Sequence, residues 1–314
     1  MDERTASAIE WLLDSREPAV RYLTRRDLLG EDGQDDRDRI LEGPWVRALL
    51  AGQQADGGFG RHPYGKWTGA HWRLVSLVEL AVPAGHPPAM RALETVFDWL
   101  TARERLSRIL PKEDGRTYRC ASQEGNALAV ACRLGAAGDD RARLLAEALV
   151  RWQWPDGGWN CSAGSISSLH ETHPPMWGLH EYAAVTGDHA AVATARKAAE
   201  PFLTRRLFRS LRTGEVIHQQ WLALHYPPYW HYDVLQGLLV LSRMGLIGDP
   251  RAAEALDHLE KRRLPDGRWR AGAYWWRPAR PGGAAQEVVD WGRSGPNQMI
   301  TLNALRVLRA AGRL

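Results

Sequence analysis

The chain has 314 residues, of which 44% are hydrophobic and 25% are charged, and these proportions exclude wholesale disorder. The net charge is only +4, and because the basic residues are spread along the chain we expect no nucleic-acid partner. The N-terminal sequence lacks the basic region of a signal peptide, and no apolar run approaches the ~18 residues that a membrane span requires. Three cysteines (Cys120, Cys132 and Cys161) are too few for a disulfide framework, so they predict a reducing, cytoplasmic compartment.

Helical periodicity begins at the N-terminus, where residues 6–13 and 18–29 predict a hairpin of two amphipathic helices within about residues 4–30. From about residue 35 onward, helices with one charged face alternate with more apolar helices. The first kind covers residues 90–100, 144–152 and 256–263. The second kind begins near His71-Trp72, Ser122, Pro175-Met176, Tyr232-Asp233 and Asn297-Gln298. Glycines suited to helix C-caps follow at positions 135, 187, 245 and 312. Strand patterns are nearly absent, so we predict an all-α protein.

A turn motif repeats between the helices. Residues 53–59 (QQADGGF) match residues 153–159 (QWPDGGW) and 263–269 (RLPDGRW), and weaker copies lie at 113–116 and 212–215. The spacing of about 50 residues indicates one helical hairpin per repeat. With the N-terminal hairpin this makes six hairpins in two layers, and closing them into a ring removes the need for polar end caps. We therefore predict a single (α/α)6-type toroid domain over residues 1–314.

The Q-x-x-D-G-G-[FW] motif of residues 53–59 and 153–159 resembles the QW repeat of squalene and oxidosqualene cyclases, whose α/α toroid is shared by the β-subunits of protein prenyltransferases. The resemblance covers most of the chain and implies architecture more than chemistry, because a fold does not determine a function. In the motif itself we expect the glutamine to bridge helix ends, Asp-Gly to form the turn, and the aromatic ring to pack under the next helix pair. These residues are expected to be scaffold.

The catalytic signatures of the resembled families do not carry over. The D-x-D-D acid of squalene-type cyclases is missing, since neither Asp32–Asp36 nor Asp139-Asp140 matches it, and no D-D-x-x-D helix is present. Prenyltransferases hold zinc with Asp-x-Cys at the start of one inner helix and a histidine from the next. Here His231-Tyr232-Asp233 stands at the first position, and no histidine stands at the second. Squalene cyclisation is therefore not expected.

Polar residues gather at the starts of the apolar helices, which converge on one rim in a toroid. From them we take Cys120, His170, Glu171, His225, His231 and Asp233 as candidate catalytic residues. Histidine paired with a carboxylate, as in His231 with Asp233 or His170 with Glu171, can act as a base near neutral pH. Cys161, His170 and either His231 or Asp233 are ligand types that zinc takes. Cys120 is either a reactive thiol or a small buried residue. Metal binding, acid–base catalysis and purely structural hydrogen bonding all remain open.

Aromatic residues at the same helix starts predict a substrate wall made of Trp67, Trp72, Trp177, Tyr229, Trp230 and Tyr232. Tyr274-Trp275-Trp276 is expected to be a lid or a surface loop. The combination favours an enzyme acting on a small, largely apolar molecule, such as an isoprenoid, with acid–base groups or zinc at the barrel mouth. A carbohydrate-active (α/α) barrel enzyme and a non-catalytic binding toroid are the alternatives.

Overall fold

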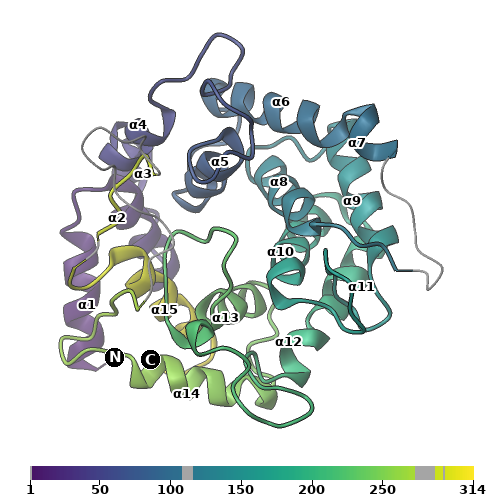
Figure 1. Ribbon diagram of the computed structural model, residues 1–314. Helices are drawn as coiled ribbons and strands as arrows, with labels where there is room; N and C mark the ends of the chain where they lie inside the picture. The colour runs from purple at the N-terminus through teal and green to yellow at the C-terminus, as the bar shows by residue number, and fades with distance from the viewer. Residues whose placement is uncertain (1, 108–115, 273–286, 293) are drawn as a thin grey trace, which may run out of the picture. The chain divides into compact units, whose positions relative to one another are not determined.

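The structure is a computed structural model that describes residues 2–107, 116–272, 287–292 and 294–314, without the side chains of residues 106 and 107. The predicted lid Tyr274-Trp275-Trp276 lies outside these residues. Regular structure in the described ranges consists of helices (Figure 1), with three isolated β-bridges and no strand, which confirms the all-α prediction. None of the described helices combines the length and the apolar character needed to cross a membrane.

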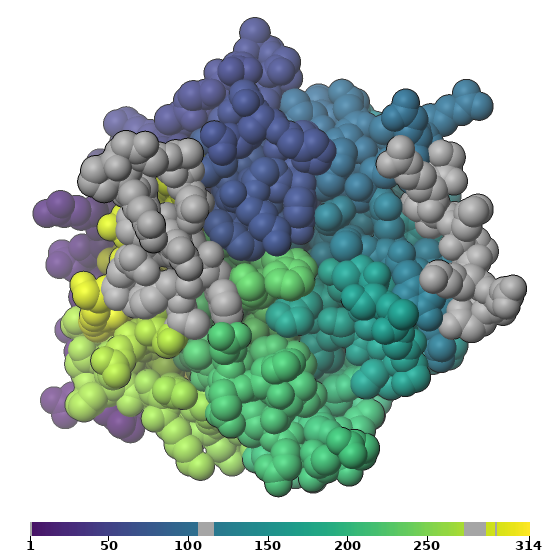
Figure 2. Space-filling view, viewed as in Figure 1, coloured from purple at the N-terminus to yellow at the C-terminus, as the bar shows by residue number. Residues whose placement is uncertain are grey.

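The chain divides into two compact units. The terminal unit comprises Met1–Ala51, Glu79–Val82 and Leu203–Leu314, and the central unit comprises Gly52–Val78 and Pro83–Phe202. Side chains fill the spaces between neighbouring helix ribbons of the central unit, coloured blue to teal in Figure 2. Closure of the helices into a toroid stays a prediction.

The terminal unit contains the predicted N-terminal hairpin, formed by α1 and α2. Its α-helices are α1 (Glu3–Leu13), α2 (Pro18–Thr24), α3 (Gln34–Asp38), α4 (Pro44–Leu50), α13 (Val234–Arg243), α14 (Ala253–Lys261) and α15 (Gln298–Ala310). A π-helical turn (Arg25–Leu29) and 3-10 turns (Ile40–Glu42, Gln219–Leu222, Pro250–Ala252) complete the unit. The short α12 (Glu200–Thr204) falls where the chain passes from one unit to the other. Helices α13 and α15 pack together and are buried over most of their length.

The central unit is built around α8 (Ala121–Arg133) and α10 (Leu169–Thr186), which lie side by side (Figure 1). Around this pair lie α5 (Ala70–Glu79), α6 (Pro87–Thr101), α7 (Arg103–Ser107), α9 (Asp140–Trp152) and α11 (His189–Ala198). Helix α8 buries 11 of its 13 residues and α9 only 6 of 13, which confirms the predicted alternation of drier and wetter helices. The two buried helices α8 and α10 form the core of this unit.

Two glycines allow α8 and α10 to approach backbone to backbone. A Cβ atom on Gly125 would lie 2.3 Å from the nitrogen of Pro175, and one on Gly178 would lie 2.3 Å from the carbonyl oxygen of Gly125. Only glycine fits at such distances, so these two positions set the separation of the helices.

Most predicted helix boundaries agree with the structure, and one is wrong. Helix α10 begins at Leu169 instead of near Pro175, and it contains both Pro174 and Pro175. Proline lacks the N–H that a helix interior uses and is therefore favoured in the first turn of a helix. Here the tight packing of the prolines against α8 retains them inside the helix, so His170 and Glu171 lie in its first turn. The predicted C-cap glycines at 135, 187, 245 and 312 all have positive φ angles, as expected.

The glutamine of the QW-like motif bridges helix ends, as predicted. The side-chain amide of Gln153 donates to the carbonyl of Gly157 at 2.7 Å, within its own turn, and to the carbonyl of Thr194 in α11 at 2.9 Å. Gln53 makes the matching pair of bonds to its own turn and to α6, at 2.9 Å and 2.8 Å. Each turn is thereby attached to the next charged helix.

The third copy of the motif keeps the same construction with a different residue. Arg263 stands where the others have glutamine, and its guanidinium donates to the carbonyl of Gly267 at 3.2 Å and to the hydroxyl of Thr5 in α1 at 2.7 Å. The indoles of Trp159 and Trp269 donate back to the carbonyls of the preceding helices, whereas we expected these rings to pack under the following helix pair. The motif residues are scaffold.

Candidate metal centre

Three side chains with metal-binding atoms meet in the central unit. The sulfur atoms of Cys120 and Cys161 and a carboxylate oxygen of Glu171 all lie within 4.8 Å of one another. Cys120 is the N-cap of α8, Cys161 follows the second QW-like turn, and Glu171 lies in the first turn of α10. Three separate segments of the chain therefore supply the cluster, which we call the thiol cluster.

Main-chain pairing brings the two cysteines together. Tyr118 and Asn160 form an isolated parallel bridge, and the N–H of Arg119 donates to the carbonyl of Asn160 at 3.1 Å. Each cysteine comes within two residues of this bridge, so the bridge determines their separation.

Glu171 is held by the N-terminus of α8. One of its carboxylate oxygens accepts the N–H of Ser122 at 3.0 Å, and the side chain is only 2% exposed. An acidic group at a helix N-terminus is stabilised by the unpaired N–H groups and by the helix dipole. The same bond ties α10 to α8 directly beside Cys120.

A hydrogen bond joins the two thiols. It is the main cause that lowers the pKa of the Cys161 thiol to about 6, against the opposing effect of its burial. The same hydrogen bond, followed by burial, raises the pKa of Cys120. Both cysteine residues are half-buried, so they remain within reach of solvent.

A buried carboxylate and two arginines stand next to the thiol cluster. Glu124, 1% exposed, accepts hydrogen bonds from Arg105 at 2.8 Å and from Arg119 at 2.9 Å, both to the same carboxylate oxygen. Arg119 directly precedes Cys120 in the chain. Two guanidinium groups therefore share one carboxylate oxygen of Glu124 next to the thiol cluster.

Aromatic rings cover another side of this region. The ring of Tyr64 lies 5.2 Å from that of Trp72, 5.6 Å from that of His71 and 5.6 Å from that of Trp99. Burial, with the charges of Glu171 and both thiols among the further causes, raises the pKa of Tyr64 to about 12. Burial also lowers the pKa of His71 to about 3, so its imidazole is neutral at physiological pH. The half-buried Tyr64 and Trp99 thus border the thiol cluster.

The residues predicted to bind metal do not meet as expected. We combined Cys161 with His170 and with His231 or Asp233, but Cys161 lies with Cys120 and Glu171. Within the described residues, His170 belongs to no group of three close ligand side chains. His231 and Asp233 belong to the terminal unit, whereas Cys161 belongs to the central unit.

Asp233 pairs with His225, a partner that we did not predict, and the pairing of His231 with Asp233 stays a prediction. Its carboxylate lies 2.6 Å from Nδ1 of His225, accepts the N–H of the same residue at 2.8 Å, and caps α13 through the N–H of Gln236. His225 and Asp233 are 4% and 0% exposed. A pair so deeply buried stabilises the start of α13, and His231 is half-buried with its ring 4.9 Å from that of Trp230.

Most of the predicted substrate-wall aromatics are buried. Trp67, Trp72, Trp177, Tyr229 and Tyr232 are at most 8% exposed, and Trp230 is half-buried. The polar atoms of the buried rings bind protein groups. Trp177 donates to Glu181 at 2.9 Å, Tyr232 donates to the carbonyl of Leu207 at 2.9 Å, and Tyr229 donates to Glu287.

Sequence reasoning missed Cys120 as a partner of Cys161, and it missed Tyr64 and Arg105 entirely. Nothing in their local pattern marks these residues, because Tyr64 follows a QW-like turn and Arg105 lies in the short helix α7. A pair of cysteines at similar distances after successive turns was the one available signal. No protein-family model matches the chain, and no curated protein matches it either.

Proposed function

We propose that this protein is a zinc-dependent enzyme acting on a small, largely apolar molecule, and that Cys120, Cys161 and Glu171 hold the metal. The observation that carries the proposal is the convergence of two sulfur atoms and a carboxylate oxygen within 4.8 Å. Catalytic zinc sites use three protein ligands and leave one position for water or substrate.

The donor set fits zinc better than harder cations. Thiolates are soft ligands that select zinc over magnesium or calcium, which prefer oxygen. Metal ligands have to be deprotonated, and the lowered pKa of the Cys161 thiol favours its deprotonation. Glu171 is oriented by the N–H of Ser122, an outer bond of the kind that fixes a metal ligand in place.

The surroundings support catalysis over a purely structural role. Structural zinc sites are closed by four protein ligands, whereas three ligand side chains gather here among the described residues, and both cysteine residues are half-buried. Zinc in such a site acts as a Lewis acid and lowers the pKa of bound water. Tyr64 and Trp99 supply apolar ring surface at the border of the cluster, and Arg105 supplies hydrogen-bond donors. The resemblance to zinc-containing prenyltransferases agrees with this class of enzyme, although the ligands differ.

Elemental analysis of purified protein tests the metal. We expect about one zinc per chain in the wild type, and less than about one tenth of that in Cys161→Ala, since one lost ligand typically weakens affinity strongly. Cys132→Ala is the matched control, because Cys132 is a buried thiol within α8 and takes no part in the cluster. Wild-type protein that binds no zinc even when zinc is supplied would refute the metal centre.

Cobalt substitution tests whether a coordination position is open. Cobalt in the wild-type site should show thiolate-to-metal absorption, and the absorption per bound cobalt ion in Cys120→Ala or Cys161→Ala should be about half of the wild-type value, since one of two thiolates is removed. Added azide or a small thiol should shift the visible bands if the fourth position is free. Unchanged bands would indicate a closed, structural site and would count against the enzyme.

A further inference from the structure

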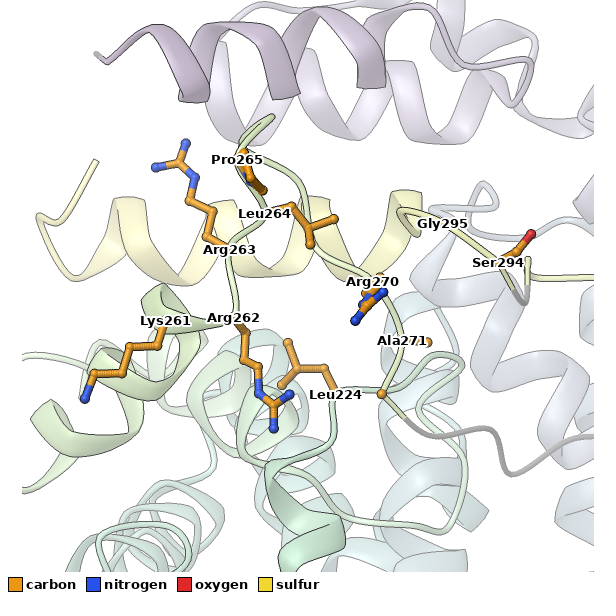
Figure 3. A pocket seen from close by; sticks show the side chains of 11 residues that line it. Leu224, Lys261, Arg262, Arg263, Leu264, Pro265, Arg270, Ala271, Ser294 and Gly295 are labelled. Carbon is orange, nitrogen blue, oxygen red and sulfur yellow. The ribbon is translucent and has the colours of Figure 1, made fainter.

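A hollow in the terminal unit collects positive charge. It has a volume of about 750 Å³ and lies between the end of α14 with the turn that follows it, the segment Arg270–Gly272, Leu224, and Ser294-Gly295 (Figure 3). Its lining includes Lys261, Arg262, Arg263 and Arg270, and none of the described residues that line it is acidic. We call it the basic hollow.

The backbone around the basic hollow is held by hydrogen bonds. Gly272 donates to the carbonyl of Leu224 at 2.8 Å, and Arg270 forms a bridge with Pro296. The turn is closed by the bond from Leu264 to the carbonyl of Arg268, at 2.8 Å. These bonds hold in place the main chain that carries the lining side chains.

Three of the four cations have no counter-ion. Arg263 is only 9% exposed at its side chain and pairs with Asp2 at 3.3 Å. Lys261, Arg262 and Arg270 are exposed and form no ion pair in the part of the chain that the structure describes. In Figure 3 the side chains of Arg262 and Arg270 extend near Leu224, whereas Lys261 extends away from it.

The acidic residues nearby are already engaged. Asp257 and Glu260 of α14 both pair with Arg313, at 2.7 Å and 3.0 Å, and Asp266 lies 3.7 Å from Arg268. The negative end of the α14 dipole explains cations at positions 261 and 262. It does not explain Arg270, which approaches from a different segment.

We infer that the basic hollow binds a small organic phosphate, independently of the proposed zinc site. The guanidinium groups of Arg262 and Arg270, both without an ion pair in the described residues, suit a dianionic phosphate better than a singly charged carboxylate, since arginine matches phosphate oxygens in bidentate geometry. The remaining lining is largely apolar, with Leu224, Leu264, Pro265 and Ala271. This apolar surface favours a phosphate that carries an organic group over the inorganic ion, and the volume is within the range of small-molecule pockets.

Phosphorus NMR titration of the full chain tests this inference, with phenyl phosphate and inorganic phosphate as probes. We expect phenyl phosphate to bind several-fold more tightly, since its ring covers apolar lining atoms. The double variant Arg262→Gln/Arg270→Gln should bind at least about tenfold more weakly, because two charge-assisted hydrogen-bond partners are lost.

The matched control removes the same charge elsewhere in the terminal unit. Arg47 and Arg212 are exposed and form no ion pair in the described residues, and Arg47→Gln/Arg212→Gln should change the dissociation constant by less than about twofold. Equal losses in the two double variants would show that attraction is only to overall charge and would overturn the site. So would the absence of binding at low ionic strength.

Discussion

At the scale of single residues, arginine neutralises two of the buried acids that the structure describes. Glu79 pairs with Arg243 at 2.8 Å, and Glu124 pairs with Arg105 and Arg119. Burying a carboxylate costs free energy unless a cation or several donors accompany it. In these pairs an arginine offsets the cost of burying the carboxylate. Glu17 has no such arginine partner among the described residues.

Glu17 is buried without a direct cation partner. It is 3% exposed, one carboxylate oxygen accepts the N–H of Trp45 at 2.6 Å, and the other has no hydrogen-bond partner. Burial raises its pKa from 4.5 to about 7, against the smaller opposing effects of the Trp45 bond and of Arg21. Between pH 4.5 and about pH 7, the Glu17 carboxyl group is therefore protonated in the folded state and ionised in the unfolded state.

We predict that this proton makes folding stability fall as pH rises. The contribution of Glu17 is complete below its unfolded pKa of 4.5 and is lost as pH passes through about 7. Glu17→Gln, which keeps an acceptor for Trp45, should be more stable than wild type at pH 8 by roughly 2–3 kcal/mol. Urea unfolding followed by circular dichroism measures the difference, and a variant with the same pH dependence as the wild type would contradict it.

At the scale of elements, the separation of α8 and α10 decides whether the thiol cluster can form. Cys120 starts one helix and Glu171 lies in the first turn of the other. Because Gly125 and Gly178 bring the two backbones into contact, a change in the middle of the pair is transmitted to its N-terminal ends.

Gly178→Ala should therefore weaken both the fold and metal binding. Its Cβ would lie 2.3 Å from the Gly125 carbonyl oxygen, and we expect a loss of about 1–3 kcal/mol in the free energy of unfolding. Zinc affinity should fall at the same time, measured by competition with a chromogenic chelator. Gly138→Ala is the control, since a Cβ at Gly138 meets nothing within 4 Å. Unaltered zinc affinity in a destabilised Gly178→Ala protein would separate the helix contact from the site.

The QW-like turns show how one element tolerates a substitution. In the third copy Arg263 replaces glutamine and still reaches its own turn and the neighbouring helix. The required property is a donor group at the end of a side chain long enough to reach both acceptors. In each of these turns, the side chain at the first motif position therefore has a structural role, which is to hydrogen-bond its own turn and a neighbouring helix.

At the scale of the whole molecule, a bound metal should stabilise the folded chain. A ligand that binds only the folded state adds about 4 kcal/mol when its free concentration is a thousand times its Kd. Removing zinc with a chelator should lower the melting temperature of the wild type by several degrees, at about 2–4 °C per kcal/mol. The melting temperature of Cys161→Ala should not change when the chelator is added. Differential scanning calorimetry measures the melting temperatures of both proteins with and without the chelator. Equal decreases in the two proteins would contradict the assignment of the metal to the thiol cluster.

A feature could be predicted from the sequence where residues close together in the chain determine it. Local rules for capping and periodicity gave four helix starts that the structure confirms within two residues, namely those at His71, Ser122, Asp233 and Asn297. The start of α10 was placed wrongly, because packing against Gly125 overrides the local effect of Pro174 and Pro175. Local rules fail where another element supplies the stabilising contact.

The sequence alone determined the all-α class, the hairpin repeat and its turn chemistry, since each depends on residues within one or two helical turns of one another. Only the tertiary structure decided which ionisable groups meet. It paired Asp233 with His225 in the loop just before α13, and it brought Cys120 to Cys161 and Glu171, which lie in distant segments of the chain. Periodicity along the chain contains no information about the distances between these side chains. In the thiol cluster, the bridge at Tyr118 and the α8–α10 contact determine them.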